Sequence, residues 1–261
     1  MRKDQSIKSS QLVFNPKARI KKVLNYINKT LGVLIYSILP SNINDQVRSM
    51  TIKVHKENKV VFKIEDLGRI TRYRAKSFSK KEPETISWID SFEQKDTLLD
   101  IGANIGMYSL YAASRSHRVL AIEPEGQNFC SLTRNLILNN LTTKVSAFPL
   151  ALNDQAGFSL LNIGLDGNEY GSAHHSLGNT KNQYGEEFVP SRSQGVIGVT
   201  MDEIIDNWKY EINHIKIDVD GNELLVLKGA NKSLNSKSLK SILVELSINH
   251  PGYKVSIELI E

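Results

Sequence analysis

Apolar positions along this chain change spacing in a regular way. Short runs of consecutive apolar residues, typical of buried strands, occur at 98–101, 119–122, 145–150, 196–199, 214–219 and 241–246. Segments with apolar residues every three or four positions, typical of amphipathic helices, occur at 83–92, 107–113, 125–139, 201–208 and 222–229. Strands that alternate with helices imply a parallel sheet with right-handed crossovers. The pattern therefore predicts an α/β fold with helices on both faces of a mostly parallel sheet.

The regions around this core follow other patterns. Residues 51–55 and 59–64 flank a Lys-Glu-Asn turn and predict a hairpin that leads into 72–78. Residues 153–195 are rich in Gly, Asn and Ser, so we expect irregular loop and edge strands there.

The first fifty residues predict a basic extension with one amphipathic helix, followed by a single catalytic domain at 51–261. The apolar stripe of this helix runs from Ile20 to Ile38, and its first half is basic. We favour packing of the stripe against the domain. The alternative is peripheral contact with an anionic membrane through residues 18–39.

The charge distribution argues against nucleic-acid binding. The net charge of the chain is +5, but residues 1–30 hold eight Lys or Arg and one acid, so the rest of the chain sums to −2. A nucleic-acid-binding domain normally carries a basic face on its folded body. The single cysteine, Cys130, is consistent with a reducing compartment, and we expect a cytoplasmic protein with membrane association as the alternative.

Two predicted strands end in carboxylates that are typical of a nucleoside site. Asp100 precedes a glycine-punctuated turn, and Glu123 ends the next strand, where the ribose diol lies in wound α/β sheets. A dinucleotide turn needs glycines at its third and sixth positions, which here are Asn104 and Met107. An acid beside the turn repels phosphate and attracts a cation. The pattern favours S-adenosylmethionine, which carries a sulfonium, an ammonium and a ribose.

Several motifs in order along the chain resemble FkbM-type methyltransferases. They are Asp-Ile-Gly-Ala-Asn-Ile-Gly at 100–106, Ile-Glu-Pro at 122–124, Asn128, Asn135 and Asn139, Thr-Met-Asp at 200–202, Lys-Ile-Asp-Val-Asp-Gly-Asn-Glu at 216–223, Leu-Lys-Gly-Ala at 227–230, and Val-Glu-Leu at 244–246. The resemblance covers roughly residues 70–250. It implies the class I methyltransferase (Rossmann-like) fold and methylation of oxygen, often on sugar hydroxyls. Asp220 stands where the family more often has Glu.

The resemblance also implies the residues that bind the cofactor. The turn around the methionine moiety would be formed by Gly102, Ala103, Asn104 and Gly106, with Asp100 near the ammonium group. Glu123 would accept hydrogen bonds from both ribose hydroxyls. Ala151 and Leu152 would border the adenine, and Asp218 would lie in the ligand crevice.

The base that would deprotonate an alcohol acceptor has several candidates. Asp218 and Glu245 follow predicted strands and are the favoured pair, while His174 or His175 could serve from the long loop. Asp218 could instead form a structural ion pair with Lys216. The histidines could also hold a metal with Asp166 and Glu169, but that spacing matches no known ligand pattern, so we expect no metal site.

Three functions compete at this stage. The leading hypothesis is an S-adenosylmethionine-dependent methyltransferase that acts on a glycan or a hydroxylated small metabolite. A nicotinamide-dependent oxidoreductase is disfavoured by the glycine spacing. A catalytically impaired family member is the third, because residues 253–260 resemble the helix that precedes the family's C-terminal edge hairpin and the sequence ends at Glu261.

Overall fold

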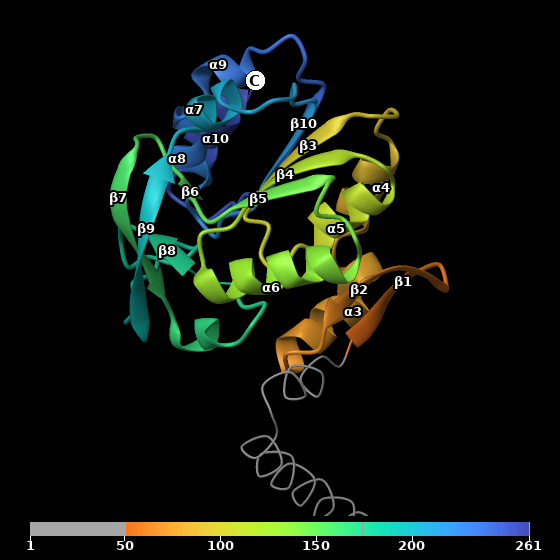
Figure 1. Ribbon diagram of the computed structural model, residues 1–261. Coiled ribbons are helices and arrows are strands. Elements are labelled where there is room, and N and C mark those ends of the chain that lie inside the picture. The colour runs from red at the N-terminus through yellow and green to blue at the C-terminus, as the bar shows by residue number, and fades with distance from the viewer. Residues whose placement is uncertain (1–50, 174, 261) are drawn as a thin grey trace, which may run out of the picture. The chain divides into compact units, whose positions relative to one another are not determined.

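The computed structural model describes residues 51–173 and 175–260, and a parallel sheet forms their centre (Figure 1). Its five strands are β3 (Thr97–Ile101), β4 (Arg118–Ile122), β5 (Val145–Phe148), β10 (His214–Ile217) and β11 (Ser241–Val244). They lie in the order β11-β10-β3-β4-β5, and every neighbouring pair is parallel. The α/β prediction is therefore confirmed. The predicted extension at 1–50, with its amphipathic helix, lies outside the described residues.

Helices cover both faces of this sheet (Figure 1). Helices α5 (Met107–Ser114) and α6 (Gly126–Leu138) lie on one face, while α7 (Met201–Asp206), α8 (Glu223–Lys228), α9 (Asn231–Leu234) and α10 (Tyr253–Ile260) lie on the other side. Alternate residues of β3 divide between the two cores: Leu98 packs with α5 and α6, and Leu99 packs with α7 and α8. This alternation follows from the two-residue period of a strand that is buried on both faces.

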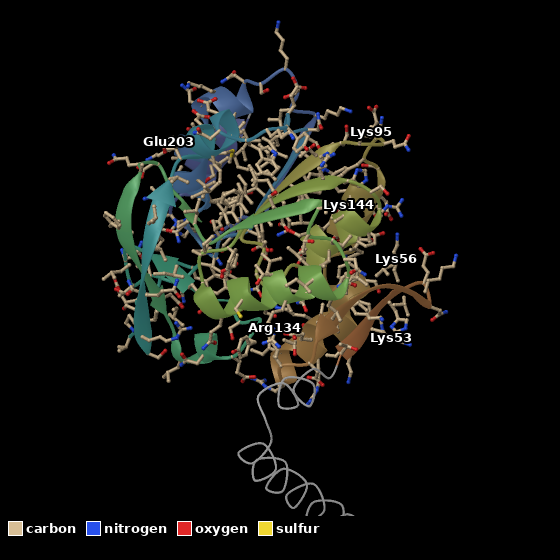
Figure 2. All side chains as sticks on the ribbon, in the orientation of Figure 1. Lys53, Lys56, Lys95, Arg134, Lys144 and Glu203 are labelled. Carbon is tan, nitrogen blue, oxygen red and sulfur yellow. The ribbon has the colours of Figure 1, made fainter. Side chains whose placement is uncertain are left out.

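A hairpin precedes the sheet, as the sequence predicted. Strands β1 (Thr51–Lys56) and β2 (Lys59–Glu65) pair antiparallel, and β2 packs against α6. Arg134 on α6 makes an ion pair of 2.7 Å with Glu65, and Figure 2 shows Arg134 on the side of α6 that faces this hairpin. Residues 72–78 belong to the helix α3 (Arg69–Lys81), which is followed by α4 (Pro83–Asp90) with proline in its first turn.

A second sheet of four strands lies beside the first. It consists of β6 (Ala151–Leu152), β7 (Gly157–Ile163), β8 (His175–Leu177) and β9 (Arg192–Val199) in the order β6-β9-β7-β8, with the 3₁₀ turn η1 (Leu165–Asn168) after β7. The continuous strand predicted at 145–150 is wrong: β5 ends at Phe148, and the chain resumes as β6 in the other sheet. Pro149 has no N–H to donate to a strand ladder, which is consistent with the break at this point.

The described chain ends in the predicted helix, α10. Strand β11 is one edge of the parallel sheet as far as the described residues extend. Within residues 51–173 and 175–260, no helix has the length and apolar character needed to cross a bilayer.

Candidate active site

A cavity of about 380 Å³ lies at the carboxyl ends of the parallel strands. Residues that follow four of these strands line it: Gly102 after β3, Glu123 after β4, Asp218 after β10 and Glu245 after β11. A volume of this size is in the range of small-molecule sites. The cavity therefore lies where ligands bind in open α/β sheets.

The glycine turn after β3 forms one wall of the cavity. Gly102 has a φ of 80°, and a Cβ atom there would lie 1.8 Å from the carbonyl oxygen of Asp218. Any side chain at this position would therefore push the turn away from β10. The N–H groups of Gly102 and Ala103 both donate to the carbonyl of Ile122 at 2.9 Å, which ties the turn to β4.

Gly106 does not line the cavity. It is the N-cap of α5 with a φ of 90°, and a Cβ atom there would come within 2.4 Å of the Leu132 side chain on α6. Gly106 thus starts α5 and leaves the space in which the Leu132 side chain of α6 packs. Its neighbours Ala103 and Asn104 line the cavity.

Glu123 is buried at the end of β4, and its carboxylate faces the turn. One oxygen accepts a hydrogen bond from the N–H of Asn104 (2.7 Å), and the other accepts from the N–H of Glu125 (2.8 Å). Burial raises the pKa of Glu123 to about 8 despite these two donors. Each oxygen keeps a further lone pair, so the residue can also accept from a diol in the cavity.

Asp100 lies behind the cavity wall and does not line it. Its carboxylate accepts a hydrogen bond from the Ser109 hydroxyl on α5 (2.6 Å), and burial raises its pKa. Asp100 thus joins β3 to α5 beneath the turn. Its position near the cofactor ammonium, directly or through water, stays a prediction.

Asp218 is held by the ammonium group of Lys216, which donates to it at 2.7 Å. Burial alone would raise the pKa of Asp218, but the Lys216 charge outweighs it and the pKa is lowered. Lys216 itself is buried, and the charges of Asp218 and Asp100 keep its pKa raised. The ion pair that the sequence left as an alternative is present, and Asp218 nevertheless lines the cavity.

Glu245 meets Asp218 and Glu82 in one corner of the cavity. Oxygen atoms from these three carboxylates all lie within 4.8 Å of one another. The negative charge of Asp218, followed by burial, raises the pKa of Glu245 to about 7. Lys216 donates to Asp218 and Lys81 donates to Glu82, so ammonium groups already neutralise two of the three. Glu245 is then the carboxylate that exchanges its proton near neutral pH.

Another part of the lining is apolar. Ala151 and Leu152 line the cavity with Leu150, as expected for a surface that borders a flat ring. Ala173 and His175, from the loop and strand after η1, also line it. His174 and the side chain of Asp166 lie outside the described part of the chain, so the metal alternative built on them stays untested.

Four cavity residues could not be found from the sequence, and they come from α3, from the single residue between α3 and α4, and from α5. These are Arg74, Lys81, Glu82 and Tyr108. The Tyr108 ring lies 5.1 Å from the Lys216 ammonium group, and burial raises the pKa of its hydroxyl. The first three precede the turn in sequence and belong to no motif, and a tyrosine in a predicted core helix is indistinguishable from packing.

The family model for the methyltransferase FkbM domain matches residues 100–258. This match covers the turn, Glu123, Asp218 and Glu245, and it spans more than half of the chain. The chain belongs to the FkbM methyltransferase family. With the order of the parallel strands described above, this membership confirms the predicted class I methyltransferase fold.

Two curated relatives agree with this assignment. The chain is 29% identical to methyltransferase sdnD of Sordaria araneosa over 174 residues, which cover 57% of this chain and 65% of the relative. It is 28% identical to hexuronic acid methyltransferase AglP of Haloferax volcanii over 161 residues, which cover 60% of this chain and 59% of that protein. The chain thus spans less than two thirds of the length of either relative.

Among solved structures, the N-terminal domain of human METTL16 in complex with SAH is similar over 68% of this chain and 60% of that one. The TM-score is 0.39 and the identity is 15%, so we draw no argument from this similarity.

Proposed function

We propose that this FkbM family member is an S-adenosylmethionine-dependent O-methyltransferase that acts on a sugar or another hydroxylated acceptor. The observation that carries the proposal is the buried Glu123 carboxylate, which faces a glycine turn across a cavity that has an apolar wall on one side and carboxylates on the other. The Glu123 carboxylate suits a ribose diol, the apolar wall suits a flat adenine, and the remaining carboxylates suit a cation.

The residues present fit the cofactor. Glu123 would hold the ribose, Gly102, Ala103 and Asn104 would shape the wall at the methionine moiety, and Ala151 with Leu152 would border the adenine. Within the described lining, the acids Glu82, Glu123, Asp218, Asp220 and Glu245 outnumber the cations Arg74, Lys81 and Lys216. The raised pKa values of Glu123 and Glu245 leave both partly protonated at neutral pH, and a cation such as a sulfonium would favour their ionised forms. When bound, S-adenosylmethionine supplies a methyl group on a good leaving group.

The chain's own contribution to methyl transfer is to align the acceptor and to take its proton. Glu245 is suited to accept that proton, because its pKa of about 7 leaves a large fraction ionised at neutral pH. Asp218, kept ionised by Lys216, is suited to accept a hydrogen bond from the acceptor hydroxyl and to orient it. We therefore assign Glu245 as the base and Asp218 as its partner.

The acceptor class is suggested by the same corner of the cavity and by one relative. Three carboxylates within 4.8 Å of one another can accept hydrogen bonds from neighbouring hydroxyls, as a polyol or sugar offers them. The relative AglP is named as a hexuronic acid methyltransferase. A sugar hydroxyl is thus the acceptor that we propose, on a free metabolite or on a glycan.

Calorimetric titration with S-adenosylhomocysteine tests the proposal without the acceptor. We expect saturable binding with one site per chain and a rise in the midpoint of thermal unfolding, because a ligand that binds only the folded state stabilises it. NADH, titrated in parallel and followed by its fluorescence, should give no response. Folded protein that ignores S-adenosylhomocysteine would contradict the proposal, and a response to NADH would favour the oxidoreductase.

A further inference from the structure

The loop at 169–173, called the roof below, borders the cavity through Ala173, and the side chain of Asn104 anchors it on the glycine turn. The Nδ2 group of Asn104 donates to the carbonyl of Ser172 at 2.6 Å. Its Oδ1 atom accepts from the N–H of Ile105 (2.9 Å), and its own N–H donates to Glu123. Both polar side-chain atoms of Asn104 are therefore engaged within the protein.

A second asparagine, on α6, holds the same loop from below. Asn128 is buried, its Nδ2 group donates to the Ser172 carbonyl at 3.1 Å, and its Oδ1 atom accepts from the N–H of Gly171 at 2.8 Å. The carbonyl of Ser172 thus accepts from two amides that come from different elements. Convergence of two side-chain donors on one loop carbonyl fixes the loop more strictly than a single bond would.

Helix α3 holds the outer side of the roof. Arg74, which lines the cavity, donates from Nε to the carbonyl of Gly171 at 2.6 Å. Ser172 is buried, and Ala173 directly after it lines the cavity. The position of the roof is therefore linked through Asn104 to the turn at one end of the cavity and through Arg74 to the acceptor end.

The backbone conformation of Asn104 is one that only a few residue types adopt easily. Its φ of 52° is in the left-handed region, which glycine adopts freely and asparagine better than most residues. Glycine would satisfy the turn equally well but would leave the Ser172 carbonyl with one donor fewer. The turn itself therefore does not require this side chain, and the roof uses it.

We propose that Asn104 is a positioning residue which couples occupancy of the cofactor cavity to the position of the 169–173 roof, with Asn128 as the fixed half of the clamp. A ligand that contacts the turn at 102–104 then orders the roof, and through Ala173 it shapes the acceptor end of the cavity. The coupling to the cofactor rests on the function proposed above, whereas the clamp itself does not.

Hydrogen–deuterium exchange of the backbone amides at 171–173 tests the clamp first without ligand. Asn104→Gly keeps the left-handed turn and removes two side-chain bonds, to Ser172 and to Ile105, of which only the first reaches the roof. We therefore expect exchange at 171–173 to accelerate roughly 2- to 10-fold, as loss of one hydrogen bond to the roof predicts. Asn128→Ala, which leaves the turn intact, should accelerate the same amides. The matched control is Asn140→Gly, which makes the same change at an exposed asparagine with a φ of 56° and should leave these amides unchanged.

The second arm repeats the measurement with S-adenosylhomocysteine. In the unaltered chain the ligand should slow exchange at 171–173, and in Asn104→Gly this protection should be lost. Reciprocity requires the ligand affinity of the variant to fall by the same factor as the protection. Equal protection in both proteins would mean that the ligand orders the roof without the Asn104 side chain, and a loss of affinity far beyond that factor would mean that this side chain acts on the ligand itself and not through the roof. Either result would overturn the coupling.

The two arms separate the two proposals. If exchange at 171–173 is the same in Asn104→Gly and the unaltered chain without ligand, the clamp is wrong whatever the cavity binds. If the unaltered chain fails to bind S-adenosylhomocysteine, the proposed function is wrong, and the coupling to that cofactor is wrong with it, but acceleration in the ligand-free arm would still establish the clamp.

Discussion

Each end of strand β10 carries a buried side chain that is hydrogen-bonded to an aspartate, and the two contacts serve different purposes. At the amino end, His214 contacts Asp96 at 2.9 Å and the Ser241 hydroxyl at 2.8 Å, and its ring stacks on Phe92 with 3.6 Å between centroids. At the carboxyl end, Lys216 donates to Asp218, which lines the cavity. The first pair is enclosed by aromatic rings, and the second borders the cavity that we assign to ligands.

The difference teaches that burial and pairing alone do not identify a functional site. Burial lowers the pKa of His214 even though Asp96 opposes this, so the histidine is neutral and acts as a packing element. In the other pair the Asp218 charge raises the pKa of Glu245 to about 7. The functional end is recognised by the unequal titration of neighbouring carboxylates in a cavity.

Replacement of Lys216 should give the largest effect, and it tests whether the Lys216 charge stabilises the buried carboxylates at the carboxyl end of β10. Lys216→Met removes the ammonium group that faces both Asp100 and Asp218, so we expect a loss of about 3–5 kcal/mol in the free energy of unfolding. Urea unfolding measures this loss. Lys232→Met, which breaks an exposed pair with Asp206, is the control and should leave the unfolding curve where it was. Equal curves for both variants would contradict the account.

Removal of the Glu123 carboxylate should affect the ligand end of the sheet. Glu123→Ala should weaken binding of S-adenosylhomocysteine by about 1–3 kcal/mol, the range for leaving buried hydrogen-bonding groups without their partner. Calorimetric titration measures the change, with Glu211→Ala as a control at an exposed glutamate outside the cavity lining. Unchanged affinity in Glu123→Ala would mean that the ribose is held elsewhere.

A substitution at the amino end of β10 should lower stability and leave ligand affinity unchanged. His214→Gln removes the ring that stacks on Phe92 and weakens the bond to Asp96, so the free energy of unfolding should fall by about 1–2 kcal/mol. The affinity for S-adenosylhomocysteine, measured on the same folded preparation, should stay at the level of the unaltered chain. A marked loss of affinity would show that the two ends are not independent.

Acidification from about pH 6.5 to about 5.5 should shift stability in opposite directions at the two ends. The pKa of His214 is lower in the folded than in the unfolded chain, so the unfolded chain takes up a proton first as the pH falls below about 6.5, and the folded state loses stability. The raised pKa of Glu123, about 8, means that the folded state takes up a proton and gains stability over the same range. Each effect is at most about 1.4 kcal/mol per pH unit. Other groups with shifted pKa values titrate in every variant, so the comparison is with the unaltered chain: the slope of stability against pH, measured by urea unfolding, should move toward a gain on acidification in His214→Gln and toward a loss in Glu123→Gln. Identical slopes in all three proteins would contradict both assignments.

The sequence predicted the parallel sheet well because its evidence is local. Each signal determines the structure of only a few neighbouring residues. Examples are the buried run at 119–122, the proline at the start of α4 and the Thr200 cap of α7. The second sheet was not predicted in this form, because β7 pairs with β9 across about thirty residues of chain. Pairing over that distance leaves no pattern in the sequence of either strand.

The site was predicted in part for the same reason. Glu123 and Asp218 follow strands at the carboxyl edge of the sheet, so sequence order alone brings them together. Asp100 was predicted near the cofactor ammonium from its position before the turn, and the two-residue alternation of β3, which turns its side chain toward α5, was not considered. Glu82 and Arg74 reach the cavity from helices whose packing no motif indicates.

The structure of the chain in complex with S-adenosylhomocysteine tests the central claim most directly. The account predicts that both ribose hydroxyls lie within hydrogen-bond distance of the Glu123 carboxylate, with the adenine beside Leu152 and the sulfur on the side of Asp218 and Glu245. A ligand bound outside this cavity, or inside it without contact to Glu123, would contradict the account.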